Sequence, residues 1–74
     1  MAREHVLDVR SMESPEPFER VMEALDRLGP GDRLIVVIDR RPAPLFRVLE
    51  RNGFAFAEAP GKDAAFEITI WRKD

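Results

Sequence analysis

Four short segments of the chain have the hydrophobic pattern of β-strands: residues 5–10, 34–38, 54–57 and 66–71. In the first, third and fourth, apolar residues alternate with polar or small ones, which is typical of strands with one buried face. Residues 34–38 (Leu-Ile-Val-Val-Ile) are apolar throughout, which predicts an interior strand covered on both faces or nearly so. The pattern therefore predicts a sheet of four strands.

Two segments between these strands have the three-and-four spacing of apolar residues that is typical of amphipathic helices, roughly residues 15–28 and 44–52. Ser14 followed by Pro15 is a favourable helix start, because serine caps exposed amides and a proline at the first helical position has no amide to cap. The positions expected to face the core are Phe18, Val21, Met22, Leu25 and Leu28 in the first helix, and Leu45, Val48 and Leu49 in the second.

The predicted order is β-α-β-α-β-β in a single domain, residues 1–74. A helical crossover of about twenty residues joins the first two strands, so they should be parallel with a right-handed connection. The turn at residues 60–63 makes the last two strands an antiparallel hairpin. We therefore expect an α+β fold, a two-layer α/β sandwich in which two helices cover one face of a mixed four-stranded sheet.

Composition narrows the classes of function. The 74 residues include no cysteine, which excludes disulfides, thiolate chemistry and cysteine-based metal sites. A net charge of −2 argues against a strongly basic module that binds nucleic acid. The longest apolar run, residues 34–38, is far shorter than the ~20 residues that span a bilayer, and the N-terminal residues lack the apolar stretch of a signal peptide. We expect no membrane partner and a cytoplasmic location.

A candidate binding site lies where both parallel strands should end and both helices should begin. Arginines and helix N-termini at this edge would attract an anion or an acidic partner, although Asp39 and two glutamates in the same connections offset the charge. The candidate binding residues of this rim are Arg10, Glu13, Ser14, Pro15, Glu16, Pro17, Arg40 and Arg41.

The sequence gives weaker support for a catalytic or binding role of the other candidate residues. His5 has no second histidine or carboxylate pair with which to hold a metal, so a structural or solvent-facing role is favoured. Ser14 has no adjacent base to activate it as a nucleophile. Trp71 should lie on the open face of the sheet, where it marks the surface of a weak homodimer or another partner, or else is covered by arginine side chains. We expect no catalysis, no metal and no cofactor.

Two strings near the N-terminus resemble the TusA and SirA sulfur-carrier families: residues 7–10 (Leu-Asp-Val-Arg) and residues 14–17 (Ser-Pro-Glu-Pro). Those families have a Cys-Pro-x-Pro string at the position of residues 14–17. The rest of the chain is similar to a sister group, the bacterial domain of unknown function 2249, in residues 28–32, 39–45, 53–54 and 71–72. The resemblance implies the same β-α-β-α-β-β sandwich, and it implies redox or haemerythrin-like proteins as a partner class.

The chain departs from the sulfur carriers at the residue that carries sulfur. Ser14 stands in place of the cysteine, and an unassisted serine hydroxyl is too weakly acidic to carry sulfur. Sulfur relay is therefore excluded. The leading hypothesis is a non-catalytic, cysteine-less relative of the carriers that docks another protein through the rim at the start of the first helix. The alternative is a module that binds a small anion or nucleotide at the same edge; RNA binding and enzyme activity rank below both.

Overall fold

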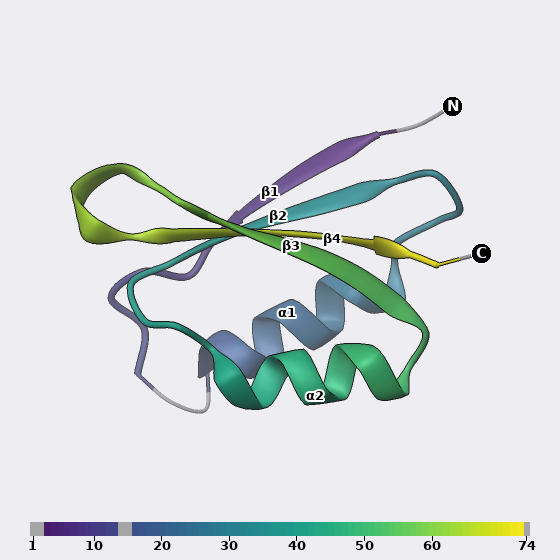
Figure 1. Ribbon diagram of the computed structural model, residues 1–74, viewed down its shortest axis with the longest axis horizontal. Coiled ribbons are helices and arrows are strands. Elements are labelled where there is room, and N and C mark those ends of the chain that lie inside the picture. Colours follow the sequence, from purple (N-terminus) through teal and green to yellow (C-terminus); the bar gives the residue numbers. More distant parts are fainter. Residues whose placement is uncertain (1–2, 14–15, 74) are drawn as a thin grey trace.

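The computed structural model describes residues 3–13 and 16–73. The described chain forms four strands, two helices and a short 3-10 turn (Figure 1). In chain order the elements are β1 (Glu4–Asp8), α1 (Glu16–Asp26), β2 (Arg33–Ile38), α2 (Ala43–Arg51), β3 (Phe54–Pro60), the 3-10 turn η1 (Lys62–Ala64) and β4 (Phe66–Arg72). Neither helix of the described chain is long and apolar enough to cross a membrane.

The four strands form one sheet in the order β1-β2-β4-β3. β1 pairs with β2 in parallel, whereas β4 pairs antiparallel with both β2 and β3. Both helices lie on the same face of this sheet, and both begin at the edge where β1 and β2 end (Figure 1). The predicted α+β sandwich and its strand pairing are confirmed.

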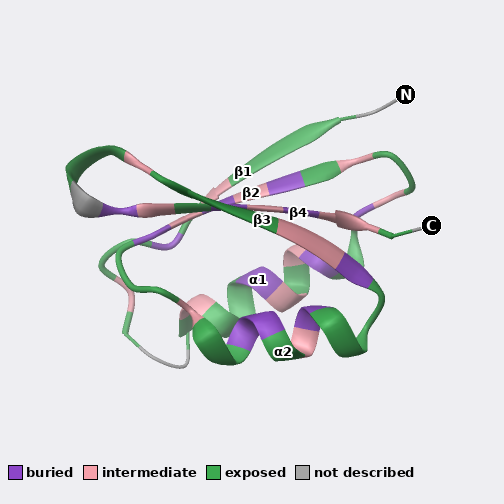
Figure 2. Cartoon of the chain, viewed as in Figure 1, coloured by how far each residue is buried: buried purple, intermediate pink, exposed green. Residues whose placement is uncertain are grey.

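The core lies between the two helices and the face of the sheet that they cover (Figure 2). Side chains alternate between the two faces of a strand, and the register places Leu34 beside Ile70 and Val36 beside Ile68. These four side chains and Leu49 of α2 are at most 1% exposed. Burying one such side chain stabilises the fold by about 1.5–3 kcal/mol, so the central strands β2 and β4 carry much of the stability.

β2 is covered on one face only, although its run of apolar residues predicted cover on both. Its helix-facing residues are buried, whereas Ile35 and Val37, which alternate with them, are half-buried. On this open face the register aligns Ile35 with Val6 of β1 and Thr69 of β4. A central strand can keep apolar residues on its uncovered face because side chains of the two neighbouring strands shield them in part.

Two aromatic residues on the helices differ from the predicted core. Phe18 was expected to face the core, but its side chain is 38% exposed. Phe46 was not expected there, yet it is only 8% exposed and its ring stacks on Phe56 of β3, with centroids 4.6 Å apart and planes 8° from parallel. The stacking explains the burial of Phe46, because the helical period alone does not predict a contact with β3. Val48, also expected inward, is half-buried.

β3 runs to Pro60 rather than ending at residue 57. The extension follows from pairing, since Ala59 lies beside Glu67 and Pro60 beside Phe66. The Gly61 N–H then donates to the carbonyl of Ala65 (2.8 Å) and closes the hairpin. The partner strand β4 therefore determines the length of β3, which its own hydrophobic pattern does not.

The single covered face can be tested with two matched substitutions on the central strands. Ile68→Val removes a methyl group from the packed face and should lower the free energy of unfolding by about 0.5–1.5 kcal/mol. Ile35→Val removes the same group from the half-buried open face and should cost less than half as much, because fewer atoms surround it. Urea denaturation of both variants measures the difference. An equal or larger loss for Ile35→Val would contradict the two-layer account.

Candidate functional site

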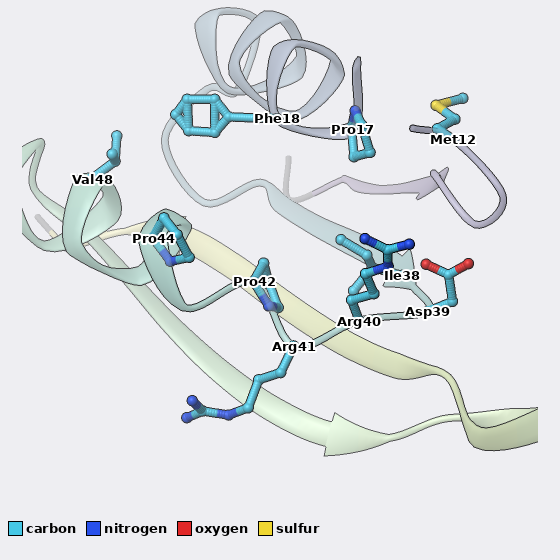
Figure 3. A pocket seen from close by; sticks show the side chains of 10 residues that line it. All are labelled: Met12, Pro17, Phe18, Ile38, Asp39, Arg40, Arg41, Pro42, Pro44 and Val48. Atoms are coloured by element: carbon cyan, nitrogen blue, oxygen red, sulfur yellow. The ribbon is translucent and has the colours of Figure 1, made fainter. Parts of the chain in front are cut away.

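A cavity of about 520 Å³ opens between the first turns of α1 and α2, at the sheet edge where β1 and β2 end. Pro17 and Phe18 of α1 line one side, and Pro44 and Val48 of α2 line the other (Figure 3). Ile38, the last residue of β2, also contributes. We call this cavity and its rim the inter-helix groove. Its size is in the range that a small ligand or a few side chains fill, roughly 300–1,000 Å³.

Prolines give the start of α2 its apolar surface. Pro42 and Pro44 have no N–H, and their fixed φ suits the first turn of a helix. The amides between and after them are already used: the Ala43 N–H donates to the carbonyl of Arg41 (3.0 Å), and the Leu45 N–H donates to that of Pro42 (2.9 Å). The first turn of α2 therefore offers hydrocarbon where most helix starts offer free N–H donors.

The arginine that follows β1 is held by its own strand. Arg10 donates to Asp8 in a two-pronged arrangement, with Nη2 2.7 Å from Oδ2 and Nε 3.0 Å from Oδ1. The side-chain hydrogen bond from Arg10 lowers the pKa of Asp8 to about 2, and the Arg10 backbone N–H adds to the effect. The same bond raises the pKa of Arg10. The positive charge expected from Arg10 at this edge is thus largely compensated.

The two arginines after β2 differ in their surroundings. The Nε of Arg41 donates to the carboxylate of Glu58 on β3 (3.1 Å), and its guanidinium lies 5.0 Å from the ring centroid of Phe46. Both residues line the groove, but the Arg41 guanidinium points away from it, whereas the Arg40 side chain points toward the side on which Met12 and Pro17 lie (Figure 3). No carboxylate in the described chain forms an ion pair with Arg40.

The turn after β1 brings Met12 to the groove. Ser11 has a φ of 69°, in the left-handed region that non-glycine residues rarely adopt. Its N–H donates to Oδ2 of Asp39 across the rim (3.1 Å), which fixes the turn against the end of β2. Met12, one residue on, is half-buried and lines the groove.

The structure brings together only part of the predicted rim. Pro17, Arg40 and Arg41 line the groove, whereas Arg10, paired with Asp8, lines a separate shallow cavity with Ser11 and Asp39. Glu13 and Glu16 are exposed; the Glu16 N–H donates to the carbonyl of Glu13 (2.9 Å). The predicted helix cap and binding residues Ser14 and Pro15 lie outside the described residues.

Sequence reasoning missed the apolar residues that make most of the groove. They are Met12, Phe18, Ile38, Pro42, Pro44 and Val48. One signal was present in the chain: prolines cluster at both helix starts, where they replace donors by hydrocarbon. The periodicity instead assigned Phe18 and Val48 to the core, because residues at the margin of a buried stripe have the same three-and-four spacing as those at its centre.

The lone histidine lies far from the groove, near the start of β1. The His5 Nε2 is 3.9 Å from Oδ2 of Asp32, and the side chain is 50% exposed. The pKa of Asp32 is lowered chiefly because its carboxylate accepts the N–H of Gly29, with a second N–H from Arg3. In the described part of the chain, no three His, Asp or Glu residues gather in a way that could hold a metal ion.

Trp71 lies on the open face of the sheet and is half-buried. The guanidinium of Arg33 is 5.8 Å from the centroid of its ring, so an arginine covers part of the surface. On the same face Val6 remains 69% exposed. The prediction of a weak homodimer through this face stays a prediction.

The chain belongs to the family described as "Uncharacterized conserved protein (DUF2249)", whose profile matches residues 6–72. Among solved structures, the chain is similar to the crystal structure of a SirA-like protein from Desulfitobacterium hafniense. The TM-score is 0.76 at 23% sequence identity, and the match covers 95% of each chain. No protein with a curated description matches. The predicted family and its relation to the SirA-like fold are confirmed.

The Asp8–Arg10 pair predicts a specific pH dependence. Because the folded-state pKa of Asp8 is lowered to about 2, the pair stabilises the fold above the ordinary aspartate pKa of ~3.9 and loses this effect as the pH falls toward 2. In an NMR titration the Asp8 carboxyl carbon should change with a midpoint near 2. Arg10→Gln should move that midpoint up toward ~3.9, while the control Arg41→Gln should leave it unchanged. An ordinary midpoint in the wild type would contradict the pairing.

Proposed function

We propose that this domain is a non-catalytic protein-interaction module that docks a partner through the inter-helix groove. The observation that carries the proposal is the cavity of about 520 Å³, lined by apolar side chains from both helix starts. Phe18 at its wall is 38% exposed, and it is not among the residues packed into the core. Exposed aromatic and aliphatic side chains at a concave site are typical of protein-binding surfaces.

Local constraints on the backbone around the groove support docking. Prolines at both helix starts have a fixed φ, and the bond from Ser11 to Asp39 holds the turn that carries Met12. A surface that is ordered before binding loses little conformational entropy when a partner covers it. The paired charges around the groove suit the polar rim that surrounds an apolar contact in many interfaces.

The alternative, a module for a small anion or nucleotide, has less support. An anion at a helix start needs free N–H donors and positive charge. Of the three rim arginines, Arg10 and Arg41 have carboxylate partners, and Pro42 and Pro44 remove donors from the start of α2. Arg40 is the one observation in its favour. The donor set therefore favours a protein partner.

The partner class rests on the family and not on the geometry. The chain resembles domains that are found with redox or haemerythrin-like proteins, and this resemblance supports a partner of that kind in the cytoplasm. A weak homodimer through the open sheet face is a separate proposal. The exposure of Val6 supports it, whereas the cover that Arg33 gives to Trp71 reduces the apolar surface available.

Two apolar-to-charged variants distinguish the groove from the open sheet face. Phe18→Asp places a charge at the groove, and Val6→Asp places one on the sheet face; both side chains are exposed, so the fold should persist. We expect proteins captured from native extract by the wild type to bind Phe18→Asp roughly 10- to 100-fold more weakly, as at an interface hot spot, and Val6→Asp unchanged.

Quantitative mass spectrometry of the captured proteins measures the effect, with circular dichroism to verify folding of both variants. Loss of binding in Val6→Asp with retention in Phe18→Asp would contradict the proposal and assign docking to the sheet face. Capture of no protein by the wild type at near-native concentration would also contradict it.

A further inference from the structure

We infer that the docking segment of the partner combines an apolar side chain, which fills the inter-helix groove, with an aspartate or glutamate carboxylate that pairs with Arg40. The inference rests on the proposed function and specifies the chemistry of its partner. It follows from the distribution of charge around the groove, where one cation differs from its neighbours.

Among the three rim arginines, Arg40 is the one without a carboxylate partner in the described residues. Arg10 lies 2.7 Å from the carboxylate of Asp8, and Arg41 lies 3.1 Å from that of Glu58. In the described residues no carboxylate forms such a pair with Arg40. Arg40 lines the groove, and its side chain points toward the side on which Met12 and Pro17 lie, whereas the Arg41 guanidinium points away (Figure 3).

The neighbouring aspartate is already engaged. Asp39 also lines the groove, and its Oδ2 accepts the N–H of Ser11 at 3.1 Å. Its charge reduces the positive potential at this end, but it forms no ion pair with Arg40. The attraction of a partner carboxylate would therefore be modest, because it comes from the single guanidinium of Arg40.

Docking of an apolar side chain would remove water from the Arg40 guanidinium, and a partner carboxylate would replace that water. Arg40 is an exposed residue, so we expect water to solvate its guanidinium in the free protein. An apolar side chain that enters the groove displaces water from the same space, and a cation that loses water without gaining a counterion is destabilised. A partner that supplies an acceptor beside its apolar anchor avoids this cost. Because Arg40 itself lines the cavity, the anchor and the carboxylate belong to one short segment.

Three six-carbon probes isolate the two parts of this chemistry: hexanoate, hexanol and hexylammonium. Each would be titrated into ¹⁵N- and methyl-labelled protein while the signals of Met12, Ile38 and Val48 are followed. We expect all three to bind in the groove in the millimolar range, hexanoate about 2- to 5-fold more tightly than hexanol, as an exposed ion pair provides. Hexylammonium should bind most weakly. The preference for hexanoate should decrease as salt rises.

Arg40→Gln and Arg41→Gln are matched variants for this test. The first should reduce hexanoate binding to the level of hexanol, and the second should leave the preference intact because Arg41 is paired with Glu58. Equal binding of hexanoate and hexanol to the wild type, or a preference that survives Arg40→Gln, would overturn the inference and leave an apolar docking groove standing.

Two further results would also overturn the inference, each for a different reason. If no probe shifts the groove signals, the groove does not accept apolar groups, and the proposed function fails with the inference. If hexanoate binds at micromolar concentration, the site is specific for a small carboxylate ligand, and the assignment of the carboxylate to a protein segment is overturned. A six-carbon probe that mimics only part of a protein interface should bind much more weakly than that.

Discussion

The parallel pairing of β1 with β2 is the constraint on which the rest of the structure depends. The register runs from Glu4 beside Arg33 to Asp8 beside Val37, and the Val9 N–H continues the pattern by donating to the carbonyl of Val37 (2.9 Å). Parallel strands need a crossover, so α1 must return the chain along one face of the sheet. α2 packs on the same face beside it. Both helices then begin where the two parallel strands end, and the groove follows from that geometry.

The side chains at this edge make the groove apolar rather than cationic. Prolines replace amide donors at the start of α2, and the carboxylates of Asp8 and Glu58 hold Arg10 and Arg41. The chain belongs to the DUF2249 family and has the SirA-like fold, but the chemistry of the surface around the groove depends on its own residues. The fold brings the helix starts together, and the local sequence there favours a hydrophobic partner surface.

The sequence predicted the fold well because periodicity reports which face of each element is buried. The alternation in residues 66–71 and the three-and-four spacing around Val21 and Leu25 correspond directly to the packed layer. The predicted topology also brought the ends of the two parallel strands and both helix starts together, where the groove lies; that this groove binds a partner stays a prediction. The sequence could not predict the pairing of Arg41 with Glu58, seventeen positions away, or the stacking of Phe46 on Phe56. Nor could it predict that Phe18 lines the groove. Those contacts depend on how helices and strands meet in space.

The most direct test of the groove as a docking surface is photo-crosslinking in the native cell. A benzoyl derivative of phenylalanine would replace Phe18, a conservative change at the groove, or Val6, which is 69% exposed on the open sheet face. Irradiation should join the protein to a partner from position 18 and not from position 6. Crosslinks to a partner from position 6 alone would contradict the account and place the working surface on the other face of the sheet.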